Sequence, residues 1–156
     1  GIWTGEDIVR VQEAGAYGVQ MATRFIGTKE CDASTAYKEY LISKSANDLA
    51  IIHSPVGMPG RAVKSPMLEK LGETGRIPPK HCSRCIHGCE PGSVKYCITH
   101  ALISAVEGNT EEGLFFSGSN LGKLREIVSV REIVEELFPE KEKSPAPEGT
   151  ENILKV

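Results

Sequence analysis

The chain has 156 residues, of which 40% are hydrophobic and 25% charged, and its net charge is −3. This length suffices for one domain with a core, and the composition is typical of a globular protein. The charge excludes the basic surface of a protein that binds nucleic acid or an anionic membrane, and no apolar run approaches the about 20 residues that span a bilayer. No signal-peptide pattern is present, so we expect a cytoplasmic protein without nucleic-acid or membrane partners.

The first residues read Gly-Ile-Trp-Thr-Gly, without an initiating methionine. A processed start explains this, and so does truncation of a longer polypeptide. Thr4 is placed to cap a helix whose apolar residues fall between positions 8 and 14, and Gly15 is placed to end it.

Residues 16–21 form a short, mostly apolar run, which is typical of a strand buried on both faces of a parallel sheet. The run is followed by Ala22 and Thr23, which are small enough for a ligand to approach the backbone. Ligands of α/β enzymes bind at such strand ends, and the last loops of (β/α)8 barrels commonly hold a phosphate. The pattern therefore predicts half of a phosphate site, and an ordinary strand end without ligand is the alternative.

The remaining elements are expected from apolar periodicity, caps and turn residues. Up to residue 79 they are a helix over 35–45 capped by Ser34 or Asp32, a strand over 48–53, a Gly/Pro-rich loop over 54–61, a helix over 66–71 and a linker over 72–79. A helix over 96–106 follows, with Ile98, Leu102, Ile103 and Val106 on one face, and then an apolar run and small-residue loop over 113–122. The last elements are a helix over 130–137, capped by Ser129 with Val130, Ile133, Val134 and Leu137 inward, and a disordered tail from Pro139.

Four cysteines fall within sixteen residues, with the spacing C-x2-C-x3-C-x7-C: Cys82, Cys85, Cys89 and Cys97. This density favours metal or redox chemistry over structural disulfides in a cytosolic chain. The C-x2-C pair suits Zn²⁺, and thiolates also hold the irons of a [4Fe–4S] cluster. The C-x2-C-x3-C portion is similar to the [4Fe–4S] segment of dienoyl-CoA-reductase-like flavoenzymes. Reduced free thiols and a disulfide are the alternatives.

Several segments, in the right order, closely resemble the nitronate monooxygenase (2-nitropropane dioxygenase) family, which includes flavin-dependent enoyl-ACP reductases. These segments are residues 1–5, 14–25, 29–32, 54–62 and 113–119. The resemblance implies an α/β fold, namely the C-terminal part of an FMN-binding (β/α)8 TIM barrel plus a small helical, Cys-rich subdomain. It also implies three regions. They are the last βα units with the strand-8 phosphate turn and following helix (1–50), a substrate and Cys-rich segment with C-terminal helices (51–138), and a disordered acidic, proline-rich tail (139–156).

The resemblance further implies two turns around the FMN phosphate. Gly1 matches the end of a Gly-Gly-Ile turn, and a Gln-Met-Gly-Thr turn corresponds to Gln20, Met21, Ala22 and Thr23. Ala22 replaces the usual glycine, which costs little at a negative φ and causes strain at a positive one. The small residues 117–120 either border the flavin or form a simple turn. The catalytic residues are expected in an N-terminal half-barrel that this chain lacks and that would be its partner.

The implied activity is the FMN-dependent oxidation of alkyl nitronates with O2, in a longer enzyme of which this fragment alone is inactive. Reduction of an enoyl-ACP by NAD(P)H is the alternative within the family. A third hypothesis, from another class, is a non-catalytic metal-binding or interaction module.

Overall fold

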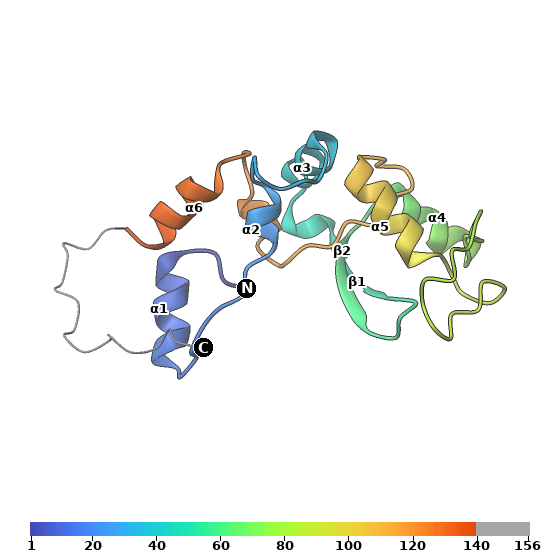
Figure 1. Cartoon of the computed structure of the whole chain (residues 1–156), viewed down its shortest axis with the longest axis horizontal. Coiled ribbons are helices and arrows are strands. Elements are labelled where there is room, and N and C mark those ends of the chain that lie inside the picture. The colour runs from blue at the N-terminus through green and yellow to red at the C-terminus, as the bar shows by residue number, and fades with distance from the viewer. Residues whose placement is uncertain (140–156) are drawn as a thin grey trace, which may run out of the picture.

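The computed structural model describes residues 1–139, so the tail expected from Pro139 lies, apart from that residue, outside the described part. The elements in chain order are α1 (Gly5–Glu13), α2 (Thr23–Ile26), α3 (Thr35–Ile42), the 3-10 turn η1 (Ala46–Asp48), β1 (Leu49–His53), β2 (Pro59–Val63), α4 (Pro66–Thr74), α5 (Ile98–Glu107), the 3-10 turn η2 (Leu121–Lys123) and α6 (Val130–Leu137). Helices α1 and α6 lie at one end of the molecule and β1, β2, α4 and α5 at the other, with α2 and α3 between them (Figure 1). The division into regions at residue 50 stays a prediction.

The helix starts are where local chemistry places them. Thr4 caps α1: its hydroxyl accepts the Asp7 amide at 3.3 Å, and the Asp7 carboxylate accepts the amides of Trp3 and Thr4 at 2.9 and 3.2 Å. Ser129 forms the same reciprocal capping box at α6. Gly15, with a φ of +97°, follows the end of α1 in the left-handed region that glycine tolerates. The expected caps are confirmed.

Strands β1 and β2 form an antiparallel hairpin, with Leu49 opposite Val63 and His53 opposite Pro59. Sequence reasoning predicted a loop over 54–61 and missed β2, because Pro59 and Gly60 disfavour a strand. Pro59 stands at the first position, where a proline is tolerated. At Gly60 a Cβ atom would lie 2.5 Å from Phe116 Cε1, so the close approach of that ring explains the glycine.

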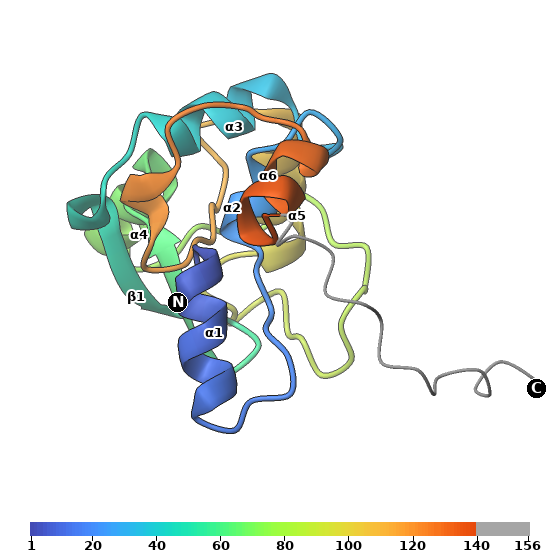
Figure 2. The ribbon, with the colours of Figure 1, turned by 90° about the vertical axis from the view of Figure 1, so that its left-hand side faces the viewer.

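The strand predicted over residues 16–21 is wrong for the described chain. Residues 12–20 are exposed, and Tyr17 is fully so. The segment runs as an open loop between α1 and α2 (Figure 2). A buried strand needs pairing strands on both sides, and among residues 1–139 the only sheet is the β1–β2 hairpin.

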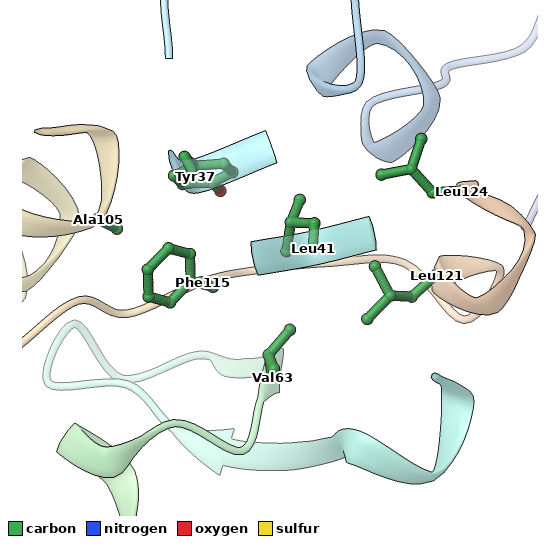
Figure 3. Packing of buried hydrophobic residues seen from close by; sticks show 7 residues of the cluster. All are labelled: Tyr37, Leu41, Val63, Ala105, Phe115, Leu121 and Leu124. Carbon is green, nitrogen blue, oxygen red and sulfur yellow. The ribbon is translucent and has the colours of Figure 1, made fainter. Parts of the chain in front are cut away.

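The central core gathers side chains from α3, β2, α5 and the segment leading to η2 (Figure 3). Phe115 is fully buried in it, with its ring centroid 5.0 Å from that of Tyr37 and 4.5 Å from that of Tyr40. A second cluster around Tyr96 and Leu114 lies under α4 and α5. A third joins Ile8 of α1 to Ile133 and Leu137 of α6.

The predicted apolar faces of α5 and α6 are only partly buried. Helix α5 buries Ala101, Ser104 and Ala105, while Leu102, Ile103 and Val106 are 37–50% exposed. Small residues face inward because α5 packs closely on α3. On α6, Ile133 and Leu137 are buried as predicted, but Val134 is exposed. Among residues 1–139, every helix is too short or too polar to cross a lipid bilayer.

Acidification is expected to weaken α6 through Glu132. The Ser129 side chain and then its amide donate hydrogen bonds that hold the pKa of Glu132 below its usual value. Because the folded pKa is lowered, this stabilisation is present above the unfolded pKa of about 4.3 and is lost as the pH falls through the folded one. Thermal unfolding measured across this pH range should show that the Tm of the wild type falls on acidification. The fall should be smaller in Glu132→Gln and unchanged in the control Glu135→Gln. An identical dependence of Tm on pH in the wild type and Glu132→Gln would contradict this role of Glu132.

Candidate functional site

Two segments far apart in the chain meet at Thr23. Its side chain is buried, and its Oγ1 accepts the Gly118 amide at 2.8 Å and lies 3.4 Å from Ser117 Oγ. Ser117 is itself buried at the end of the segment that bridges Phe116 to Ala62 of β2. The sheet edge and α2 therefore position these hydroxyls against each other.

Gly1 reaches the same loop from the other side. Asn120 Nδ2 donates to the Gly1 carbonyl at 3.0 Å, and a Cβ atom on Gly1 would lie 3.6 Å from Ser119 Oγ. The two turns that the sequence matched to a phosphate site are thus brought together, each at one end of the loop 117–120. In the sequence that loop was a run of small residues that either borders the flavin or forms a simple turn, and its contact with Thr23 across 95 residues leaves no local signal.

The other matched residues are placed differently. Ala22 has a φ of −120° and precedes α2 without a side-chain cap, so its methyl group causes no strain. Gln20 is exposed in the open loop. Met21 is half-buried and packs on the cluster of Ile8 and Ile133, so only its backbone is free to contact a ligand.

Arg24, the residue after Thr23, does not offer its charge to this site. Its guanidinium is buried, donates to the Trp3 carbonyl, pairs with Glu136 of α6, and lies 5.3 Å from the Trp3 ring centroid. These contacts fix α2 between α1 and α6, and so hold Gly1 and Thr23 in place.

The cysteine segment is a long loop between α4 and α5, anchored at both ends. The Ile77 amide donates to the Lys95 carbonyl at 2.8 Å, and the Arg76 guanidinium donates to the carbonyls of Val94 and Pro91 at 3.1 and 2.8 Å. Tyr96 is 1% exposed in the core beside it. The small helical, Cys-rich subdomain is not confirmed, because the loop contains no helix.

All four cysteines of this loop are free thiols; Cys82, Cys85 and Cys89 are exposed and Cys97 is half-buried. They line one cavity of about 480 Å³ together with His81, His87 and His100. Within residues 1–139, no three histidine, cysteine or acidic side chains stand close enough to form a ready-made metal site.

The family model for nitronate monooxygenase matches residues 1–140. The chain belongs to the nitronate monooxygenase family. Members of this family are flavin oxidoreductases, which generally bind FMN in a TIM barrel, and the described α/β chain is part of such a fold.

Individual relatives agree with this assignment. A probable nitronate monooxygenase of Staphylococcus saprophyticus is 32% identical over 73 residues, which are 47% of this chain and 21% of that protein. The solved structure of FabK from Thermotoga maritima is 28% identical with a TM-score of 0.67, covering 88% of this chain and 40% of FabK. A mutant of the same FabK is 27% identical with a TM-score of 0.65, covering 88% of this chain and 38% of the mutant. The chain thus spans less than half the length of the proteins it matches.

The residues described fit one end of FMN. Gly1 and Gly118 let two backbone segments come close to side-chain hydroxyl and amide groups, since a Cβ atom on Gly118 would lie 3.4 Å from Thr23 Oγ1. The negative φ of Ala22 leaves the turn before Thr23 unstrained. Hydroxyl and amide groups on closely approaching backbones are suitable donors to phosphate oxygens.

Proposed function

We propose that the protein is an FMN-dependent oxidoreductase of the nitronate monooxygenase type, which oxidises alkyl nitronates with O2. The observation that supports this most is the meeting of Gly1, Thr23 and the loop 117–120 in a chain of this family. FMN, when bound, supplies the redox chemistry, and the protein supplies binding and orientation.

In this proposal the described residues hold the FMN phosphate. Thr23 donates its hydroxyl hydrogen, and Gln20, Met21 and Ala22 contribute backbone amides, because the side chain of Met21 packs inward. Gly1 keeps the facing turn close to the loop 117–120. The residues that act on the substrate lie in the half-barrel outside this chain.

Replacing Thr23 by valine in the full-length protein tests the phosphate site. Loss of a hydrogen bond to a charged group costs about 1.5–3 kcal/mol, so the Kd for FMN should rise about tenfold to a hundredfold. Quenching of FMN fluorescence measures this without turnover. Thr23→Ser should bind FMN as the wild type does, and Thr110→Val, which replaces a turn threonine elsewhere, is the matched control. Unchanged FMN affinity in Thr23→Val, with a native circular dichroism spectrum, would remove Thr23 from the site.

The second candidate is an enoyl-ACP reductase that uses NAD(P)H, and the similarity to FabK over 88% of this chain favours it. Two assays of the full-length protein separate the candidates. Oxygen consumption with an alkyl nitronate supports the first, and oxidation of NAD(P)H by a crotonyl thioester supports the second. A stable protein that binds no flavin and shows neither reaction would favour the non-catalytic module.

We also propose the N-terminal half-barrel as the partner of residues 16–21. This apolar run is exposed in the described chain, although its composition suits a buried strand. Contact with the N-terminal half-barrel would cover it. Protection of these amides from hydrogen exchange in the full-length protein, but not in the isolated chain, is the expected result.

A further inference from the structure

The backbone of the cysteine segment presents its thiols through two unusual turns. Arg84, with a φ of 50°, is the one non-glycine residue of the described chain in the left-handed region, and it directly precedes Cys85. Gly88, with a φ of 74°, precedes Cys89 in the same way. Glycine adopts this conformation without strain, so Arg84 alone carries a backbone cost. The Arg84 amide also donates to Cys82 Sγ at 3.4 Å.

The second and the last cysteine of the array both lie beside the start of α5. Cys97 is the residue that precedes this ten-residue helix, and no side chain caps it. Cys85 Sγ lies 3.1 Å from Thr99 Oγ1 in the first turn of the same helix. All four cysteines line the same cavity.

Two cationic side chains line the same cavity as these thiols. Lys80 and Arg84 lie within the segment and line the same cavity as the cysteines, with His81 and His87 beside them. Lys80 pairs with Glu112 at 2.6 Å, and His100 lies 3.4 Å from the same carboxylate. A centre with four thiolates carries a net negative charge, which such cations offset.

We propose that Cys82, Cys85, Cys89 and Cys97 together bind one thiophilic metal centre, either a Zn²⁺ ion or an iron–sulfur cluster. The four cysteines already line one cavity, and both centres require four thiolates around a common point. In the proposed centre the metal draws Cys82, Cys85 and Cys89 toward Cys97 at the start of α5, because no three of the thiols converge in this structure and residues 75–97 contain no helix or strand. A loop of this length without secondary structure is usually functional. The proposal is independent of the flavin site.

Metal analysis of the full-length protein, purified anaerobically without chelators, tests this. We expect one centre per chain. Zinc without acid-labile sulfide identifies an ion, and iron with a matching amount of sulfide identifies a cluster; either result supports the proposal. Less than about a tenth of an equivalent of either metal, even after incubation with Zn²⁺ or with iron and sulfide, would overturn it.

Serine variants assign the ligands. Cys89→Ser and Cys82→Ser replace exposed residues, so the fold should survive while the metal content falls about tenfold or more. Cys31→Ser is the matched control, because Cys31 lies apart from the array and contacts its neighbours through backbone atoms. Metal should also protect residues 76–97 from proteolysis, and a chelator should abolish this protection. Equal metal loss in Cys31→Ser and Cys89→Ser, or none in either, would contradict the assignment.

Discussion

Phe115→Ala is expected to lower the free energy of unfolding by about 3–5 kcal/mol, since it removes a fully buried aromatic ring from the centre of the core. The ring packs against Tyr37 and Tyr40 of α3, and the Phe115 carbonyl accepts the Val63 amide of β2 at 2.8 Å. The cavity left by the ring would thus lie between α3 and the β1–β2 hairpin. These elements share few other contacts, so we expect them not to close the cavity. Denaturant unfolding followed by circular dichroism measures the loss.

Phe138→Ala is the matched control, because it makes the same change at a ring that is 62% exposed. Its effect should stay within about 0.5 kcal/mol. Similar losses in the two variants would show that Phe115 does not occupy the centre of the core. Phe115 also lies two residues before Ser117, so its loss should loosen the loop that contacts Gly1 and Thr23.

Arg24→Met is expected to cost about 2–4 kcal/mol, even though methionine keeps most of the apolar stem. The variant loses the charged hydrogen bond to the Trp3 carbonyl and the stacking of the guanidinium on the Trp3 ring, both in a nearly buried setting. Because Arg24 joins α1 to α6, its removal should also increase hydrogen exchange in both helices. Unfolding free energies and amide exchange rates measure the two effects separately.

Glu136→Gln separates the ion pair from the rest of these contacts. The Glu136 side chain is 60% exposed, so its pairing with Arg24 is screened by water and should contribute less than about 1 kcal/mol. A loss in Glu136→Gln as large as that in Arg24→Met would mean that the ion pair, and not the contacts with Trp3, holds α2 in place.

The starts of most helices could be predicted from the sequence because their causes are local. The ends of α3 and α4 were not, since α3 stops at Ile42 instead of 45 and α4 continues to Thr74 into the predicted linker over 72–79, and α2 was missed. Thr4, Ser34 and Ser129 cap helices through contacts within three residues, and Gly15 and Gly108 end them by adopting a positive φ. Strand β1 was also predicted, since its apolar run is short and bounded. Its partner β2 was not, because Pro59 and Gly60 are acceptable there only through the pairing with β1 and the close approach of Phe116.

Residues 16–21 and helix α5 show where composition misleads. Both have apolar residues that suit burial, yet Tyr17, Leu102 and Ile103 are exposed in the described chain. Burial depends on which surfaces are available to cover a segment, and periodicity alone does not contain that information. On α5 the small side chains of Ala101 and Ala105 occupy the buried face, because they allow the helix to pack closely.

For the candidate sites, the sequence by itself determined the residue types and the family: the Gln-Met-Ala-Thr turn, the cysteine spacing and the match to nitronate monooxygenases. Only the tertiary structure decided that Thr23 meets Ser117 and Gly118, that Gly1 meets Asn120, and that four cysteines line one cavity. The reason is physical. The sequence directly gives which hydroxyl, amide and thiol groups a turn carries. Contacts across nearly a hundred residues depend instead on how the core brings distant segments together.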